Sequence, residues 1–253
     1  MSMIVRHPLD EKDLNGIFKL RYKVFCHEWD FEKPEKHPDG IVTDAYDKNA
    51  IHLAVKDDSH KVIGAVMLIL DSPEGYPIEK NCELDINIDD LPRQNLAEIS
   101  RLVIHRNFRR RAEDTYIYGP DEDRRSIGSF AFQQHYPTQR TRYRRADDKF
   151  TPKRGMRRPN EMQSDRRRRH EVIIDLYKAV YQESKRRNLT HWYSVMTKGI
   201  VGLLNKFGFA FEAIGDPVDF HGIRTPYLAN MEKMEKEMST KNPEMYEEFT
   251  KNI

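Results

Sequence analysis

A glutamate, a serine and an arginine lie close together in the apolar segment 97–105, at Glu98, Ser100 and Arg101. Because side chains alternate along a strand, we expect Glu98 and Ser100 on one face and Arg101 on the other, unless a bulge intervenes. A carboxylate in a central strand is costly to bury, so it needs a partner or its pKa rises toward neutrality. Such a carboxylate suits a general base that takes a proton from an ammonium group. The alternative is a structural ion pair between Glu98 and Arg101 at a strand edge.

Two aspartates stand three residues apart in a polar segment, at Asp44 and Asp47, and His52 follows them. Acidic residues in such segments commonly cap helices or form turns. The functional interpretation is a negative patch that holds a cationic group of a substrate, or that orients Arg21 or Arg101. These residues alone leave the two interpretations open.

Two arginines are candidates for substrate binding. Arg21 and Phe25 are one helical turn apart, so they lie on one helix face, and a solvated arginine beside a core phenylalanine is the alternative. Arg224 lies between Gly222 and Pro226, which mark a turn. It can bind a carboxylate or a phosphate through two hydrogen bonds, or the segment is only a turn.

Hydrophobic periodicity predicts the elements that must position these side chains. We expect strands at 3–5, 51–56, 62–70, 97–105, 190–196, 209–214 and 226–230, and helices opening near residue 10, over 170–187 and 199–207, and from residue 231 onward. The polar segment 32–47, with two prolines and a glycine, is predicted as a loop. This order predicts an α/β fold with a mixed central sheet and helices on both faces.

The segment 106–169 differs from the rest of the chain. It holds 19 lysines and arginines against 9 acidic residues, whereas the whole chain of 253 residues has a net charge of only +2. Its apolar residues are sparse and prolines recur, which predicts a basic, poorly ordered insertion. The second interpretation is an arm that docks on an acidic partner. Nucleic acid is a weaker candidate, because no recognised binding motif frames the aromatic residues of the segment.

Composition bounds the class of protein. The length and the 38% hydrophobic content fit a single domain over 1–253 with one segment outside its core. Cys26 and Cys82 stand in no metal-binding or disulfide pattern, which favours a reducing compartment. The first residues turn acidic before an apolar run develops, and no stretch approaches 18 apolar residues, so we expect no signal peptide and no transmembrane segment. A cytoplasmic location follows as the expectation.

The motifs in their order resemble a known family. They are RYKVFCHE at 21–28, TDAYDKNAIHL at 43–53, GAVMLIL at 64–70 and AEISRLVIHRNFRRR at 97–111, followed by ESKRRNLTHWYSVM and LLNKFGFAFEAIGDPVDFHGIRTPY. This set resembles the branch of the GNAT acyltransferase superfamily that uses acyl carrier protein, including the acyl-homoserine-lactone (autoinducer) synthases. It is most similar to the N-acyl amino acid synthase-like acyltransferases associated with PEP-CTERM/exosortase systems.

The resemblance implies a GNAT fold and roles for individual residues. An electrostatic cluster around the amine site would comprise Arg21, Phe25, Asp44, Asp47, Glu98, Ser100 and Arg101, with Glu98 as the general base. This sequence departs from the autoinducer synthases at two places, where Phe31 stands at the spacing of a tryptophan and Met67 replaces an expected arginine. Both departures weaken the case for homoserine lactone chemistry.

The resemblance also implies the donor. No glycine-containing pyrophosphate turn follows residue 105, since the chain continues as Asn107-Phe108-Arg109-Arg110-Arg111-Ala112. The arginines Arg109, Arg110 and Arg111 suit the acidic surface of an acyl carrier protein, so we expect an acyl carrier thioester, with acyl-CoA as the other possible cosubstrate. The sheet would splay beside the strand 97–105 and admit the thioester.

The predicted reaction moves a long-chain fatty acyl group to the amine of an amino acid or a similar small amine, with no metal or redox cofactor. The alternative is a non-catalytic GNAT-like protein that uses its basic insertion to contact nucleic acid or a membrane.

Overall fold

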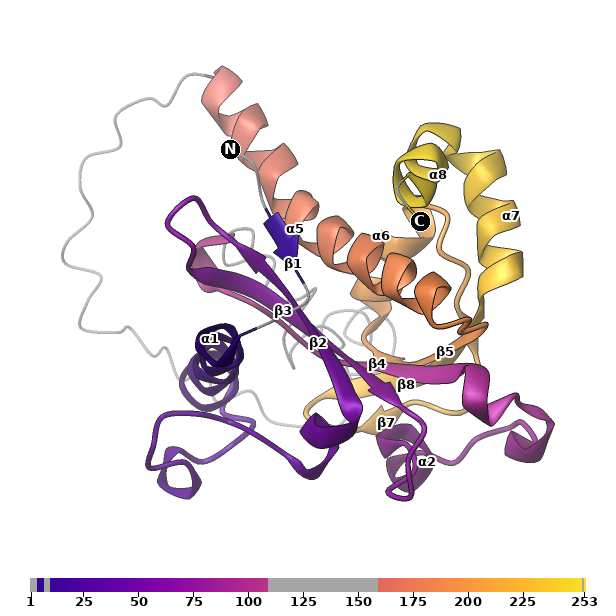
Figure 1. The fold of residues 1–253 in the computed structure, drawn as a ribbon, viewed down its shortest axis with the longest axis horizontal. Helices are drawn as coiled ribbons and strands as arrows, with labels where there is room; N and C mark the ends of the chain where they lie inside the picture. The colour runs from indigo at the N-terminus through magenta and orange to yellow at the C-terminus, as the bar shows by residue number, and fades with distance from the viewer. Residues whose placement is uncertain (1–3, 7–9, 109–158, 252) are drawn as a thin grey trace, which may run out of the picture.

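The computed structural model describes residues 4–6, 10–108, 159–251 and 253 (Figure 1). A mixed sheet has the strand order β1-β2-β3-β4-β5-β8-β6, and β7 also pairs with β8. The strands are β1 (Ile4–Arg6), β2 (Ala50–Lys56), β3 (Val62–Leu70), β4 (Leu96–Ile104), β5 (His191–Met196), β6 (Glu212–Ala213), β7 (Val218–Asp219) and β8 (Ile223–Asn230). The α-helices are α1 (Glu11–Tyr22), α2 (Pro77–Asn81), α5 (Pro159–Arg186), α6 (Lys198–Lys206), α7 (Met231–Lys241) and α8 (Pro243–Thr250).

Shorter helical turns join these elements. A π-helix over Lys23–Glu28 continues α1, and 3₁₀-helices lie at Pro34–Lys36, Ala45–Asn49, Ile88–Asp90, Arg93–Asn95 and Arg106–Phe108. The described part of the chain contains no helix that is both long enough and apolar enough to cross a membrane.

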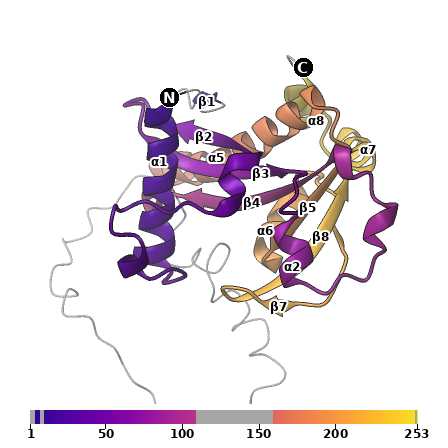
Figure 2. The same cartoon turned by 60° about the horizontal axis from the view of Figure 1, so that its bottom comes forward.

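Helices cover both faces of the sheet, as the sequence predicts (Figure 2). The side chains of β2 alternate between the two layers: Leu53 and Val55 pack in the cluster that includes the inner face of α5, whereas Ala54 packs in the cluster that includes α1. Asp10 is the N-cap of helix α1, and its carboxylate accepts a hydrogen bond from the Asp13 N–H. The local signals of α1 and of the β2–β3 hairpin therefore agree with the final packing.

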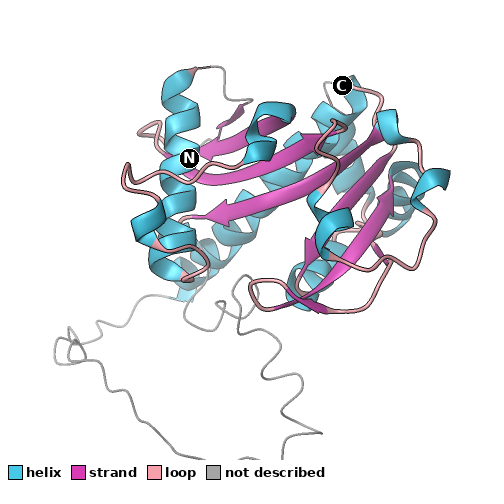
Figure 3. Ribbon diagram, turned by 90° about the horizontal axis from the view of Figure 1, so that it is seen from below, coloured by secondary structure: helices cyan, strands magenta, loops and turns pink. Residues whose placement is uncertain are grey.

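The two halves of the sheet separate at β4 and β5. These strands form the sheet's parallel pair, and their pairing runs from Leu96–His191 only to Glu98–Tyr193. Beyond Glu98 the strands diverge, and the two directions are visible from below in Figure 3. The predicted splay beside the segment 97–105 is confirmed, and it opens the sheet at the residue that is the candidate base.

Several predicted boundaries are wrong. Helix α5 begins at Pro159 rather than near residue 170, because its polar first turns contain good helix formers although they lack an apolar stripe. The strand expected over 209–214 shrinks to β6, since only Glu212 and Ala213 pair with β8, and the buried Phe209 and Phe211 precede the paired segment. The C-terminal helix is two helices, and Pro243 begins the second. Most of the basic segment, residues 109–158, lies outside the described residues.

We expect Gly208→Ala to lower the free energy of unfolding by about 2 kcal/mol or more. Gly208 has φ +89°, and an added Cβ would lie 2.7 Å from the Cα of Met238. The matched control is Gly202→Ala in the exposed face of α6, where an added Cβ meets nothing within 4 Å. That change should stabilise the protein by about 0.5–1 kcal/mol. Urea unfolding of both variants measures the difference, and equal effects would contradict the close approach of Gly208 to Met238 of α7.

Candidate active site

A β-bulge in β4 brings the three candidate catalytic side chains to the same cavity. Ala65 pairs with Val103 and Met67 pairs with Ser100, so Arg101 and Leu102 together stand opposite one residue of β3. Arg101 adopts φ +53°, in the left-handed region that non-glycine residues rarely occupy. Simple alternation would separate Arg101 from Ser100, but the bulge lets Arg101 Nη1 donate to Ser100 Oγ at 2.9 Å.

Glu98 is almost completely buried, with 2% of its surface exposed. Its Oε2 accepts a hydrogen bond from the backbone N–H of Ile78, at the start of α2, at 2.9 Å. Burial raises the pKa of Glu98 to about 7, against the opposing effects of the Ile78 N–H and of the positive charge of Arg101. A carboxyl group with this pKa exchanges protons near neutral pH, which is the property that a general base requires.

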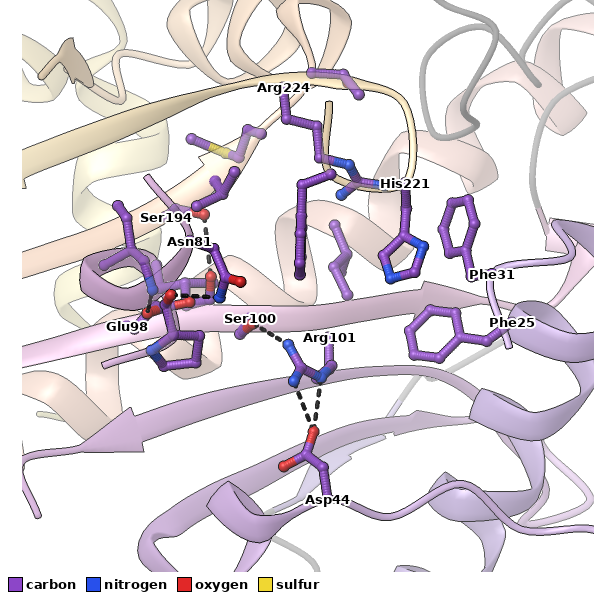
Figure 4. A pocket seen from close by; sticks show the side chains of 18 of the residues that line it. Phe25, Phe31, Asp44, Asn81, Glu98, Ser100, Arg101, Ser194, His221 and Arg224 are labelled. Carbon is purple, nitrogen blue, oxygen red and sulfur yellow. Dashed lines mark hydrogen bonds and ion pairs between the residues drawn. The ribbon is translucent and has the colours of Figure 1, made fainter. Parts of the chain in front are cut away.

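Arg101 forms its ion pair with Asp44, so the alternative of a structural pair with Glu98 is wrong. Asp44 Oδ2 accepts from Arg101 Nε at 2.8 Å and lies 2.7 Å from Arg101 Nη2 (Figure 4). The two aspartates also cap the 3₁₀-helix Ala45–Asn49, because Asp47 Oδ2 accepts from the Asp44 N–H at 2.6 Å. The sequence left two roles open for the aspartates, a turn or the orientation of an arginine. Asp44 does both, because it caps the 3₁₀-helix and pairs with Arg101.

Arg21 lies behind this pair and is buried, with 1% of its surface exposed. It donates to Asp47 Oδ1 at 2.6 Å and contacts His52 Nδ1 at 3.2 Å and Met67 Sδ at 3.4 Å. The interpretation of Arg21 as a solvated residue is wrong. Neither Arg21 nor Asp47 lines the cavity. Asp47 bonds to both Arg21 and the Asp44 N–H, so the two residues support Asp44 from behind, and the substrate binding expected of them stays a prediction.

A cavity of about 400 Å³ opens between the splayed strands. One part of its lining is apolar and belongs to β4, β5, α5 and α6: Ile99, Leu102, Ile104, Tyr177, Met196 and Ile200. The other part carries the charged side chains: Glu32, Asp44, Glu98, Arg101 and Arg224, with the imidazoles of His37 and His221. The space can therefore hold a long apolar group beside a polar, charged one.

Phe25 and Arg224, both expected to bind substrate, line the cavity together with residues that the sequence did not single out. Phe31 stacks on His221 with ring centroids 4.5 Å apart, and the guanidinium of Arg224 lies 5.6 Å from the Phe31 ring. His221 sits at the tip of the β7–β8 hairpin with φ +56°. The glycine after it signals a turn, but no sequence pattern places that turn against Phe31.

Ser194 is a second residue that sequence reasoning missed. Its hydroxyl donates to the Ile99 carbonyl oxygen at 3.0 Å, just beyond the last paired residues of β4 and β5. This bridge spans the point where the strands begin to separate. It depends on a pairing between distant segments, so nothing local in the sequence signals it.

Arg109, Arg110 and Arg111 lie outside the described residues, and their predicted donor contact stays a prediction.

The fold and a family match define the class of this protein. Residues 20–118, less than half of the chain, match the model of the acetyltransferase (GNAT) domain. The mixed sheet with its helices is the GNAT fold. The protein is an acyltransferase of the GNAT type. A search of curated proteins finds no match.

Several solved structures share this fold. The acyl-homoserine lactone (AHL) synthase LasI is 16% identical with a TM-score of 0.53, covering 90% of this chain and 89% of its own. The CoA-dependent acyl-homoserine lactone synthase BjaI is 13% identical with a TM-score of 0.57, covering 96% and 88%. FeeM, an N-acyl amino acid synthase from uncultured soil microbes, is 9% identical with a TM-score of 0.51, covering 95% and 97%. At these identities the likeness establishes the shared fold.

We expect Asp47→Asn and Asp44→Asn to fail in different ways. Asp47→Asn leaves the buried Arg21 without its carboxylate, which should lower the free energy of unfolding by about 3–5 kcal/mol. The Asp44–Arg101 pair is partly exposed, so Asp44→Asn should cost about 1 kcal/mol or less while raising the KM for the acceptor. Urea unfolding and steady-state kinetics separate the effects, and an exchange of the two phenotypes would refute this assignment.

Glu98→Gln should stabilise the protein at alkaline pH. The pKa of Glu98 is raised from 4.5 to about 7 in the folded protein, so the folded state holds a proton that the unfolded state has lost between these values. Wild-type stability therefore falls as pH rises from 4.5 to 7, and the variant lacks this loss. The advantage of Glu98→Gln should grow by on the order of 3 kcal/mol between pH 4.5 and 8. Denaturation at both pH values tests this, with the exposed Glu212→Gln as the control.

Proposed function

We propose that this protein is an N-acyltransferase that moves a long-chain fatty acyl group from an acyl carrier protein thioester to the amine of an amino acid or a similar small amine. The observation that carries the proposal is the position of Glu98. A buried carboxyl group with a pKa of about 7 stands where β4 and β5 separate, on the wall of a cavity that is apolar in one part and charged in another. Acyl transfer to an amine needs a base, an apolar site for the chain and a polar site for the acceptor.

The reaction proceeds by general-base catalysis. The acceptor ammonium loses a proton to Glu98, directly or through a water molecule, and the free amine attacks the thioester carbonyl carbon. Backbone N–H groups of β4 beyond its pairing with β5 stabilise the resulting oxyanion. Collapse breaks the carbon–sulfur bond and forms the amide as the nitrogen loses its second proton. The leaving thiolate takes up that proton, and Glu98 releases the first proton to solvent. Arg101 and Ser100 shape the polar wall beside the base.

The donor assignment rests on composition and on the cavity. The apolar lining along Ile99, Tyr177 and Ile200 suits an acyl chain. The lack of a glycine turn after β4 and the basic residues 109–111 favour a carrier protein over free CoA. BjaI, by contrast, is described as CoA-dependent, so acyl-CoA is the donor to compare in the assay.

The acceptor assignment follows FeeM rather than the lactone synthases. FeeM is an N-acyl amino acid synthase, and the polar part of the cavity can hold both charges of an amino acid. Met67 and Phe31 depart from the pattern of the autoinducer synthases, which argues against homoserine lactone chemistry. A link to PEP-CTERM/exosortase systems, a cytoplasmic location and independence of metal and redox cofactors belong to the same proposal. The non-catalytic alternative is not favoured, because the family match is to an acyltransferase domain.

We expect Glu98→Gln to lower turnover about 10²–10⁴-fold with little change in donor KM, because the amide keeps the shape and loses the base. Wild-type kcat/KM should rise with pH through about 7 as the Glu98 carboxyl ionises, and the residual activity of the variant should lack this step. The assay is thiol release from acyl carrier protein and from acyl-CoA with a panel of amines, with the amide identified by mass spectrometry. Glu212→Gln is the control. Undiminished turnover in folded Glu98→Gln would remove Glu98 as the base.

A further inference from the structure

The backbone N–H that bonds to Glu98 belongs to a very short helix. Helix α2 spans five residues, Pro77–Asn81, and its Ile78 N–H donates to Glu98 Oε2 at 2.9 Å. A helix of little more than one turn gains too few backbone hydrogen bonds to hold its own shape. The direction of the Ile78 N–H must therefore be set by contacts that side chains make with this segment.

Two side chains make such contacts. Tyr76 is fully buried, and its hydroxyl donates to the Leu96 carbonyl oxygen of β4 at 2.7 Å, which holds the start of the segment against the strand. Asn81 Nδ2 donates to the Pro77 carbonyl oxygen at 2.7 Å, which ties the last residue of α2 to its first. The tyrosine fixes where the segment lies, and the asparagine fixes how its first peptide group is turned.

The Asn81 contact and the Glu98 contact are the two ends of one peptide group. The Pro77 carbonyl and the Ile78 N–H belong to the same planar unit and point in opposite directions, so they can only turn together. Asn81 holds the carbonyl end, and Glu98 receives the N–H end. A hydrogen bond to the carbonyl also polarises the peptide and strengthens the bond that its N–H donates. Both effects favour the ionised form of Glu98, which accepts the hydrogen bond.

We propose that Asn81 is a positioning residue for the base, because it holds the Pro77–Ile78 peptide with its N–H directed at the Glu98 carboxylate. This inference rests on the proposed function for its effect on catalysis, whereas its effect on proton binding by Glu98 does not. Asn81 and Glu98 line the same cavity, and both are labelled in Figure 4. The side chain of Asn81 is exposed, so a substitution there leaves the apolar core unchanged.

Other described groups also act on the Glu98 carboxyl group, and none of them acts through this peptide. A positive charge and a hydroxyl group of β4 favour the carboxylate, and an acidic residue of α2 opposes it. Burial raises the pKa of the neighbouring cysteine and of the neighbouring tyrosine of β5, so both are neutral near pH 7. The residue paired with Glu98 on β3 is apolar. These neighbours are Arg101, Ser100, Glu79, Cys82, Tyr193 and Ile69.

Urea unfolding at pH 5 and pH 9 tests the proposal without turnover. In Asn81→Ala the carboxylate loses support, so Glu98 of the folded protein should ionise at a pH higher by about half to one unit. The unfolding constant of Asn81→Ala relative to wild type should therefore rise by a further threefold to tenfold, roughly, between the two pH values. In the Glu98→Gln background this rise should be absent. Asn49→Ala, which removes an amide that donates to Glu74, is the control and should show no rise in either background.

The pH profile of acyl transfer gives the second readout. The step in kcat/KM should move to higher pH in Asn81→Ala by the same amount, with the alkaline plateau and the donor KM close to wild type. Asn81→Gln keeps an amide donor and should retain part of the effect. A cost that is equal at both pH values and in both backgrounds would make Asn81 a structural cap and overturn the inference. If Asn81→Ala does not fold, Asn81→Leu must give the same pH dependence. Absence of thiol release with every amine would reject the proposed function, and the unfolding data would still decide the role of Asn81.

Discussion

The burial of one carboxyl group in the middle of the sheet is the constraint on which the site depends. Glu98 is 2% exposed and receives a hydrogen bond from the Ile78 N–H, which does not compensate for the loss of water, so its pKa rises to about 7. Burial makes the ionised form of Glu98 energetically costly, and for the same reason the carboxylate takes up a proton readily, which is what a general base must do. The separation of β4 from β5 begins at Glu98. The carboxyl group therefore faces the cavity while the rest of the side chain stays buried in the sheet.

A chain of ion pairs connects the cavity wall to the core of the α1 layer. Arg101 occupies a left-handed backbone conformation that costs about 1–2 kcal/mol, and its contacts with Asp44 and Ser100 hold it there. Asp44 is fixed through its own N–H by Asp47, which is bonded to the buried Arg21. The orientation of a group on the cavity wall is thus set by a residue of the first helix that touches no part of the cavity.

The sequence predicts the local features of this arrangement and misses those that depend on distant pairing. Asp10 predicts the start of α1, and the apolar runs predict β2, β3 and β4, because each signal acts within a few residues. The side on which Arg101 lies could not be predicted, since it depends on the register between β3 and β4. The burial of Arg21 follows from the packing of α1 against β2 and β3, and the contact between Phe31 and His221 joins segments that are far apart in the chain.

The replacement of an expected arginine by Met67 is explained by charge balance in the buried cluster. Met67 is fully buried, and its sulfur lies 3.4 Å from the Arg21 guanidinium. Burial already lowers the pKa of Arg21, and the positive charge of Arg101 adds to this, whereas Asp47 and Asp44 oppose it. Two arginines and two aspartates leave the cluster neutral, and a third cation at residue 67 would have no carboxylate to match it.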